Sequence, residues 1–281
     1  MLIQPYELDE LHFAYCYRVF MRWRTYRARP IPSLAALSKS TLTKLVEGYD
    51  IHVLECATNP TDLLLEVSLK PNDTISIAAS KLKGKVSGWI RGELDLKQPE
   101  RLLSAGYFAC TVGNSTSRDV EKYLSEQAVH HGYAQRRLPP VYSERFEPDE
   151  SHIIPKHASV ISRFHCVLAT SWRKGVFGSV SGEQLTAEWK KLQAKRRFVL
   201  RKVSFVPDHV HLALRLHPAV SPAETIVDLM NVSQEFMKRE LVTVGIDRLW
   251  QPSAYIGSYG DLASPQIRKY IENWEYAQLS A

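Results

Sequence analysis

The chain has 281 residues, of which 44% are hydrophobic and 23% charged, so it is long enough for one large or two ordinary globular domains. Its net charge of +6 and pI of about 9.0 suit a polyanionic partner without proving one. Four cysteines without CxxC spacing argue against a disulfide framework, and no apolar run is long enough to cross a membrane. Because the N-terminus lacks a signal-peptide pattern, we expect a cytoplasmic protein.

The first part of the chain alternates strand and helix patterns. Hydrophobic periodicity predicts a long strand over 10–26, a helix over 33–47, strands over 50–57 and 62–69, a helix over 74–94, a short strand over 106–112 and a helix over 117–130. Ser115 or Ser117 is the candidate N-cap of that last helix. Residues 134–158 are rich in proline and charge and have little periodicity, which predicts a linker.

The same order of elements then begins again. We expect a strand over 162–172, a helix over 181–196, a strand pair over 198–216, a helix over 221–241, a short strand over 254–259 and a helix over 264–276. An offset of 147 residues relates Tyr270 to Tyr123, Gly260 to Gly113 and Pro218 to Pro71, without a gap from residue 62 to 127. This is an internal duplication.

Each half therefore reads as a βαββαβα-like unit, which favours a ferredoxin-like α/β sandwich. The expected organisation is a first domain over 1–133, a linker over 134–158 and a second domain over 159–281. The two domains would form a pseudodimer within a single chain.

The most informative pattern lies in the strand pair, where His209-Val210-His211 stands within PDHVHLALRL. Residues i and i+2 of a strand point to the same side, so the two imidazoles project together and could share one metal ion. Taken alone, the pair could equally be two hydrogen-bonded histidines without a metal. Motifs in the rest of the sequence are needed to distinguish between these two interpretations.

The second half contains DHVHL, LWQPSAYIGSYG and QIRKYIENW, and the first half contains GYFACTVG and DVEKYLSEQAVHHGY. Together these stretches resemble the single-tyrosine HUH transposases, including REP-associated tyrosine transposases, over nearly the whole chain and twice over. The resemblance implies that two strand histidines hold a divalent metal and that a helix tyrosine attacks a DNA phosphate and becomes linked to the 5′ end. It also implies a metal-binding glutamine four residues after the tyrosine, and single-stranded or hairpin DNA as substrate.

The two halves have lost complementary parts of this set. His209 and His211 correspond to Asp62 and Leu64 in the first half, and leucine cannot bind a metal. The histidine pair therefore exists only in the second half.

The tyrosine helix shows the reverse loss. Tyr123 is followed four residues later by Gln127, whereas Tyr270 is followed at that spacing by Trp274, which cannot replace an amide ligand. If the halves exchange their last helices, as dimers of the resembled family do, one complete composite site results. The predicted nucleophile is Tyr123, with Tyr270 acting in cis as the alternative.

The predicted metal set is His209, His211 and Gln127. Mixed nitrogen and oxygen ligands suit Mg²⁺ or Mn²⁺ rather than a closed zinc site, and a divalent ion offsets charge on the phosphate. Asp208 could orient an imidazole, or could be a turn residue at the surface. Tyrosine is a weak nucleophile and needs activation by nearby positive charge or a metal-bound base.

Nucleic-acid contacts are expected from basic residues interleaved with aromatic ones near the N-terminus. The candidates are Arg18, Arg22 and Arg24, together with Lys122 on the tyrosine helix. Such a mixture can stack bases and hold phosphates, or it can be an edge strand with a solvated basic face.

These observations predict a metal-dependent single-stranded DNA endonuclease and strand transferase, either a transposase or a domesticated descendant of one. It would act as a monomer with one working site. The alternatives are a catalytically inactive protein that binds DNA or RNA hairpins on the same fold, and a metal-free protein-interaction scaffold.

Overall fold

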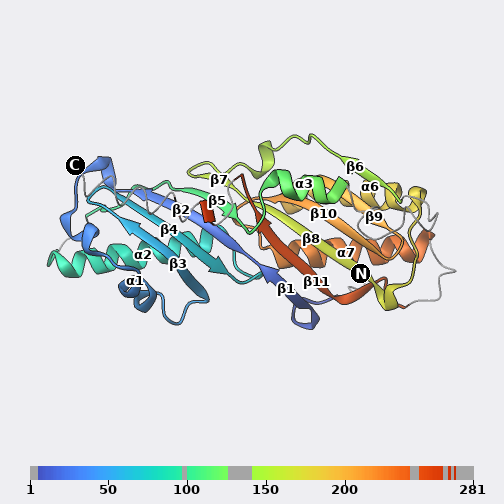
Figure 1. Cartoon of the computed structure of the whole chain (residues 1–281), viewed down its shortest axis with the longest axis horizontal. Coiled ribbons are helices and arrows are strands. Elements are labelled where there is room, and N and C mark those ends of the chain that lie inside the picture. Colours follow the sequence, from blue (N-terminus) through green and yellow to red (C-terminus); the bar gives the residue numbers. More distant parts are fainter. Residues whose placement is uncertain are drawn as a thin grey trace.

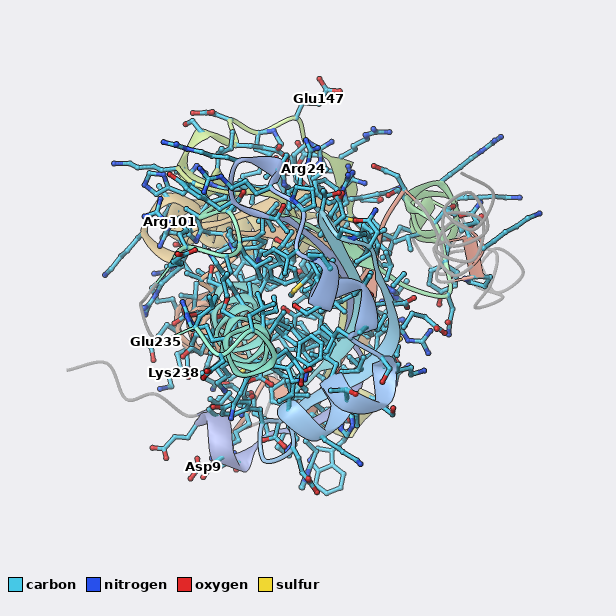
Figure 2. All side chains as sticks on the ribbon, turned by 90° about the vertical axis from the view of Figure 1, so that its left-hand side faces the viewer. Asp9, Arg24, Arg101, Glu147, Glu235 and Lys238 are labelled. Atoms are coloured by element: carbon cyan, nitrogen blue, oxygen red, sulfur yellow. The ribbon has the colours of Figure 1, made fainter. Side chains whose placement is uncertain are left out.

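The computed structural model describes residues 6–96, 100–125, 141–240, 247–261, 265, 266 and 269. Within them, two β-sheets lie end to end along an elongated molecule (Figure 1). One sheet belongs mainly to each half of the chain. Charged side chains such as Asp9 and Glu147 stand at the rim of the molecule when it is viewed along its long axis (Figure 2).

The first sheet has the strand order β3-β4-β2-β5-β7. Its strands are β2 (Arg18–Arg24), β3 (Ile51–Thr58), β4 (Asp62–Leu69), β5 (Phe108–Val112) and β7 (Ser159–Ile161). Helices α1 (Lys39–Leu45) and α2 (Ile75–Glu93) accompany it. Thr74 caps α2, because its hydroxyl accepts a hydrogen bond from the Ile77 amide at 3.2 Å.

The second sheet has the order β1-β11-β8-β10-β9-β6. Its strands are β1 (His12–Cys16), β6 (Ser143–Arg145), β8 (Arg163–Thr170), β9 (Phe198–Val206), β10 (His209–Leu216) and β11 (Trp250–Tyr259). Helices α6 (Ser179–Arg196) and α7 (Pro222–Glu240) pack on the face where Trp189 stacks on Phe205. The other face meets helix α3 (Ser117–Ser125) of the first half.

The halves exchange their leading strands. Strand β1 of the first half pairs in parallel with β11, and β7 of the second half pairs in parallel with β5. Matching hydrogen bonds join the sheets, because the Arg18 amide donates to Ser258 Oγ and the Arg163 amide donates to Thr111 Oγ1, both at 2.8 Å. Thr111 and Ser258 are 147 residues apart, so the junction has the pseudo-twofold symmetry expected of a duplicated chain.

The junction also explains why residue 113 is a glycine. A Cβ on Gly113 would lie 2.1 Å from the Ser258 carbonyl oxygen, so no other residue fits without moving the backbone. Most of the buried apolar side chains of both halves form one continuous core.

Four expectations of local structure need correction. The strand expected over 10–26 is two strands in different sheets, β1 and β2, separated at the buried Tyr17. The helix expected over 33–47 is a 3-10 segment, Pro32–Ala36, followed by the short α1. The N-cap of α3 is Thr116, whose hydroxyl accepts from the Asp119 amide while its own amide donates to the Asp119 carboxylate.

The fourth correction concerns the expected linker. Its described part, 141–158, is not a free spacer, because β6 extends the second sheet by pairing with β9 and residues 151–153 form a 3-10 turn. Most of the last predicted helix, 264–276, lies outside the described residues.

Candidate active site

Strand β10 places both histidines of the HxH pattern on the sheet face opposite α6 and α7. His209 and His211 are 2% and 3% exposed, and their ring centroids are 4.9 Å apart. Alternation along the strand puts Ala213 and Arg215 on the same face, while Val210 and Leu212 enter the core. The spacing of the sequence thus brings the two imidazoles together.

His209 is held by a chain of charged groups at the start of the strand. Its Nδ1 lies 2.7 Å from Asp208 Oδ1, and Asp208 Oδ2 accepts from Arg173 Nε at 2.8 Å. Arg173 follows Trp172, and both have positive φ angles in the turn after β8. Asp208 therefore contacts the imidazole, which is the orienting position considered for it from the sequence.

His211 is held by another imidazole that the sequence pattern did not single out. His165, on the neighbouring strand β8, places Nε2 3.0 Å from Nδ1 of His211, and the two rings stack at 5.3 Å. Burial lowers the pKa of His165 to about 4, so this ring is neutral at neutral pH. A neutral imidazole can donate or accept here, so the tautomers of His165 and His211 are coupled through this hydrogen bond.

Tyr123 reaches this cluster from the other half of the chain. Its ring centroid lies 5.6 Å from that of His211 and 5.9 Å from that of His165, and the side chain is 36% exposed. Helix α3 is seated by Val120 and Leu124, which pack with Ala213 and Tyr259 of the second sheet. The structure therefore brings a first-half tyrosine beside second-half histidines.

The donor set fits a divalent metal. His209 and His211 each make their close contact through Nδ1, which leaves Nε2 as the nitrogen that would bind the ion and matches the usual support of metal-binding histidines. Gln127 and Tyr270 lie outside the described residues. Within the described part of the chain, no three histidine, cysteine, aspartate or glutamate side chains form a metal cluster of their own.

The first half has lost this chemistry at the equivalent positions. Leu64 packs in an apolar cluster with Phe20, Ala57 and Val112. Asp62 forms an ion pair with Arg22, whose Nη2 and Nε donate to its Oδ1 at 2.7 and 3.0 Å.

Phe20 matches His165, since Phe20 pairs with Glu66 on β4 as His165 pairs with Ala213 on β10. Both imidazoles of the His165–His211 pair are thus replaced by apolar side chains in the first half. The offset between β2 and β8 is 145 residues rather than 147, which is why subtraction from the sequence did not find the match.

All four expected nucleic-acid residues belong to the first half of the chain, three on β2 and one on α3, which packs against the second sheet. Arg18, Arg22 and Arg24 lie on β2, an interior strand of the first sheet, rather than on an edge. Arg18 donates to Asn114 Oδ1 at 3.3 Å, and the aromatic Trp23 beside these arginines is buried and cannot stack on bases. Lys122 is exposed on α3, next to Tyr123.

The comparison with protein families agrees with this architecture. The model of the IS200-like transposases matches the chain twice, over residues 14–127 and 159–274. These matches cover most of the chain, so the protein belongs to the IS200-like transposase family, as the sequence motifs predicted. The tandem duplication and the two-domain α/β pseudodimer are likewise confirmed.

Two solved structures show distant likenesses to this chain. A candidate transposase from Deinococcus radiodurans R1 is 18% identical, with 39% of this chain and 89% of that chain covered and a TM-score of 0.29. A bacterial light-regulated adenylyl cyclase is 7% identical, with 86% and 72% covered and a TM-score of 0.20. Neither score supports an argument. A search of curated proteins gives no match, and no helix among the described residues could cross a membrane.

Proposed function

We propose that the protein nicks and transfers single-stranded DNA in a metal-dependent reaction, through a 5′-phosphotyrosine formed at one composite site. The observation that carries this proposal is the approach of the Tyr123 ring to His211, 5.6 Å between centroids, across the boundary between the two halves. Neither half contains both groups in the described structure. The substrate is single-stranded or hairpin DNA.

In the proposed reaction Tyr123 Oη forms a bond to the scissile phosphorus while the bond to the 3′ oxygen breaks. The phenolic proton is lost, and the leaving oxygen gains a proton to become a free 3′-hydroxyl. The phosphotyrosine keeps the strand reactive, so attack by a 3′-hydroxyl reverses the step and joins DNA.

His209 and His211, with Gln127, would hold Mg²⁺ or Mn²⁺, which when bound offsets the negative charge of the phosphate and orients it. Asp208 holds His209 through Nδ1, and His165 holds His211 in the same way. These contacts fix the two imidazoles before substrate arrives, which lowers the cost of ordering them during the reaction.

One site per chain limits the proposed biology. A single chain would nick and reseal one strand at a time. Exchange at both ends of a mobile element would need two chains or two successive reactions.

The test is formation of a covalent adduct with labelled hairpin DNA and Mn²⁺. Tyr123→Phe should form no adduct, because it lacks the attacking oxygen, whereas Tyr270→Phe should form it at a nearly normal rate. His209→Ala should lose both the adduct and Mn²⁺ binding.

A Tyr123→Phe protein that still forms the adduct would refute the composite site, and loss of the adduct in Tyr270→Phe would favour the cis arrangement. Tight hairpin binding by the unsubstituted protein without any adduct would support the inactive binding protein instead.

A further inference from the structure

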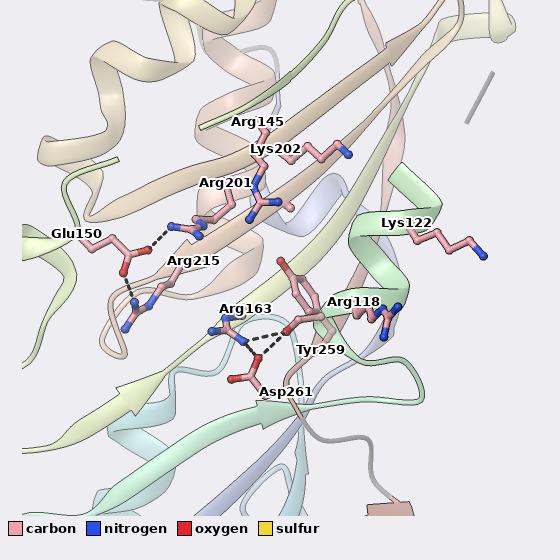
Figure 3. A pocket seen from close by; sticks show the side chains of 12 residues that line it. Arg118, Lys122, Arg145, Glu150, Arg163, Arg201, Lys202, Arg215, Tyr259 and Asp261 are labelled. Carbon is pink, nitrogen blue, oxygen red and sulfur yellow. Dashed lines mark hydrogen bonds and ion pairs between the residues drawn. The ribbon is translucent and has the colours of Figure 1, made fainter. Parts of the chain in front are cut away.

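A basic hollow lies on the second sheet beside helix α3. It has a volume of about 720 Å³, and seven arginine and lysine side chains line it against two carboxylates. Figure 3 shows Arg145, Arg201 and Arg215 at one part of the hollow, and Arg118 from α3 at another. An excess of five positive charges, seven minus two, favours an anionic ligand.

The two carboxylates hold arginines in place. Glu150 accepts from Arg201 Nη1 at 3.1 Å and also from Arg215, and Asp261 accepts from Arg163. Each pairing fixes a guanidinium at the wall of the hollow. Less side-chain conformational entropy is therefore lost when a phosphate binds there. Lys202, only 9% exposed, belongs to the same lining.

The segment between the two repeats builds one side of the hollow. Arg145 stands on β6 opposite Lys202 of β9, and Glu150 follows a few residues later. The first sheet has no such strand beyond β3 among the described residues. The segment expected to be a spacer therefore supplies lining residues to the half that carries the histidines.

The equivalent face of the first half carries acidic side chains at two positions where the second half has a lysine and an alanine. At the same positions of the ladder, Lys202 and Ala213 are paired in the second half, and Glu55 and Glu66 are paired in the first. Arg215 corresponds to Ser68. This local difference in charge distinguishes the two copies of the fold.

The hollow adjoins the candidate active site. Ala213, two positions along β10 from His211, lines the hollow and also supports helix α3. Successive residues on one face of a strand are about 7 Å apart, which is roughly the spacing of neighbouring phosphates in an extended single strand. Arginine forks bind phosphate oxygens in pairs, and contacts to phosphates carry no sequence information.

We infer that this hollow binds consecutive backbone phosphates of the single-stranded DNA that flanks the phosphate attacked by Tyr123, an inference that rests on the proposed function. Its arginines hold the strand by charge and contribute no sequence preference. The DNA path thus includes a contact contributed by the segment that joins the repeats.

The test measures binding of labelled oligothymidylate to the Tyr123→Phe protein at several salt concentrations. Arg145→Gln and Arg118→Gln should each weaken binding severalfold and reduce the slope of log affinity against log salt by about 0.7, the value for one lost phosphate contact on a single strand. Arg239→Gln, the same charge change on α7 at the opposite face, is the matched control and should leave the slope unchanged. Thermal unfolding checks that each variant is folded.

Slopes and affinities equal to those of Arg239→Gln would overturn the inference, as would variants that lose binding of inorganic phosphate but keep that of oligothymidylate. Adduct formation by the unsubstituted protein on hairpin DNA is measured in parallel. If the adduct forms while the slopes do not change, the assignment of the hollow as a phosphate-binding surface is refuted and the proposed function stands. If the slopes fall but no adduct forms, the nicking function fails while the strand-binding surface remains.

Discussion

Strand β10 of the second half presents His209 and His211 to helix α3, whereas strand β4 of the first half carries Asp62 and Leu64 at the same positions. The two strands have nearly the same burial pattern and the same place in their ladders. The duplicated fold has thus kept its backbone, while one copy carries Asp62 and Leu64 where the other carries two histidines.

The difference shows how one copy of the fold fills positions that hold histidines in the other copy. A buried imidazole without partners costs free energy, so apolar groups at these positions stabilise the first half. In the first half Leu64 and Phe20 fill it, and Asp62 is neutralised by Arg22. The same copy supplies Tyr123, whose ring lies beside His211 of the other half.

The largest expected effect comes from making the second half resemble the first. His211→Leu should abolish the covalent adduct and weaken Mn²⁺ binding by more than about 100-fold, because removing a ligand costs more than removing a residue that supports one. Metal titration and adduct assays measure both.

His52→Leu is the matched control, because His52 is an exposed histidine on β3 of the first half. It should leave both properties unchanged. A His211→Leu protein that binds Mn²⁺ normally would contradict the assignment of the second half as the metal-binding copy.

A smaller effect is expected from His165→Phe, which introduces the residue that the first half has at this position. The phenyl ring cannot hydrogen-bond to His211 Nδ1, so Mn²⁺ affinity should fall by about 10- to 100-fold while the core stays filled. His165→Gln keeps a hydrogen-bonding side chain and should recover part of the affinity. Unchanged Mn²⁺ binding in the Phe variant, with an unchanged unfolding temperature, would show that His165 only packs.

The smallest expected effect is a pH dependence of stability that arises from a difference between the halves. In the first half Lys70 and Asp50 form an ion pair at 2.7 Å, and the corresponding residues of the second half are His217 and Arg197, which are hydrogen-bonded. Burial, and then the charge of Arg197, lower the pKa of His217 from 6.5 to about 4. The Lys70 hydrogen bond lowers the pKa of Asp50.

Between pH 6.5 and about 4 the unfolded chain therefore binds a proton at His217 that the folded chain does not. Stability from this group is complete above pH 6.5 and falls as the pH falls towards 4. Thermal midpoints measured over this range should decline by a few degrees, with about 2–4 °C for each kcal/mol lost. His217→Gln should flatten that decline, and an identical pH profile in this variant would assign it to other groups.

The sequence was sufficient to predict the repeat, the family and the facing histidines. Alternation along a strand places His209 and His211 together whatever surrounds them, and a constant offset between Tyr123 and Tyr270 reveals the duplication. The sequence was not sufficient to divide the strand predicted over 10–26 into two, because nothing local marks Tyr17 as the point where the chain passes from one sheet into the other. His165 was missed for a related reason, since it contacts His211 only through strand pairing.

Periodicity and composition thus determined which residues share a face, since those patterns follow from backbone geometry within a single element. The tertiary structure decided which elements meet. It brought α3 onto the sheet of the other half, His165 beside His211, and the segment around Arg145 against β9. Such contacts depend on the burial of surfaces far apart in the chain, a non-local free energy that no stretch of sequence carries alone.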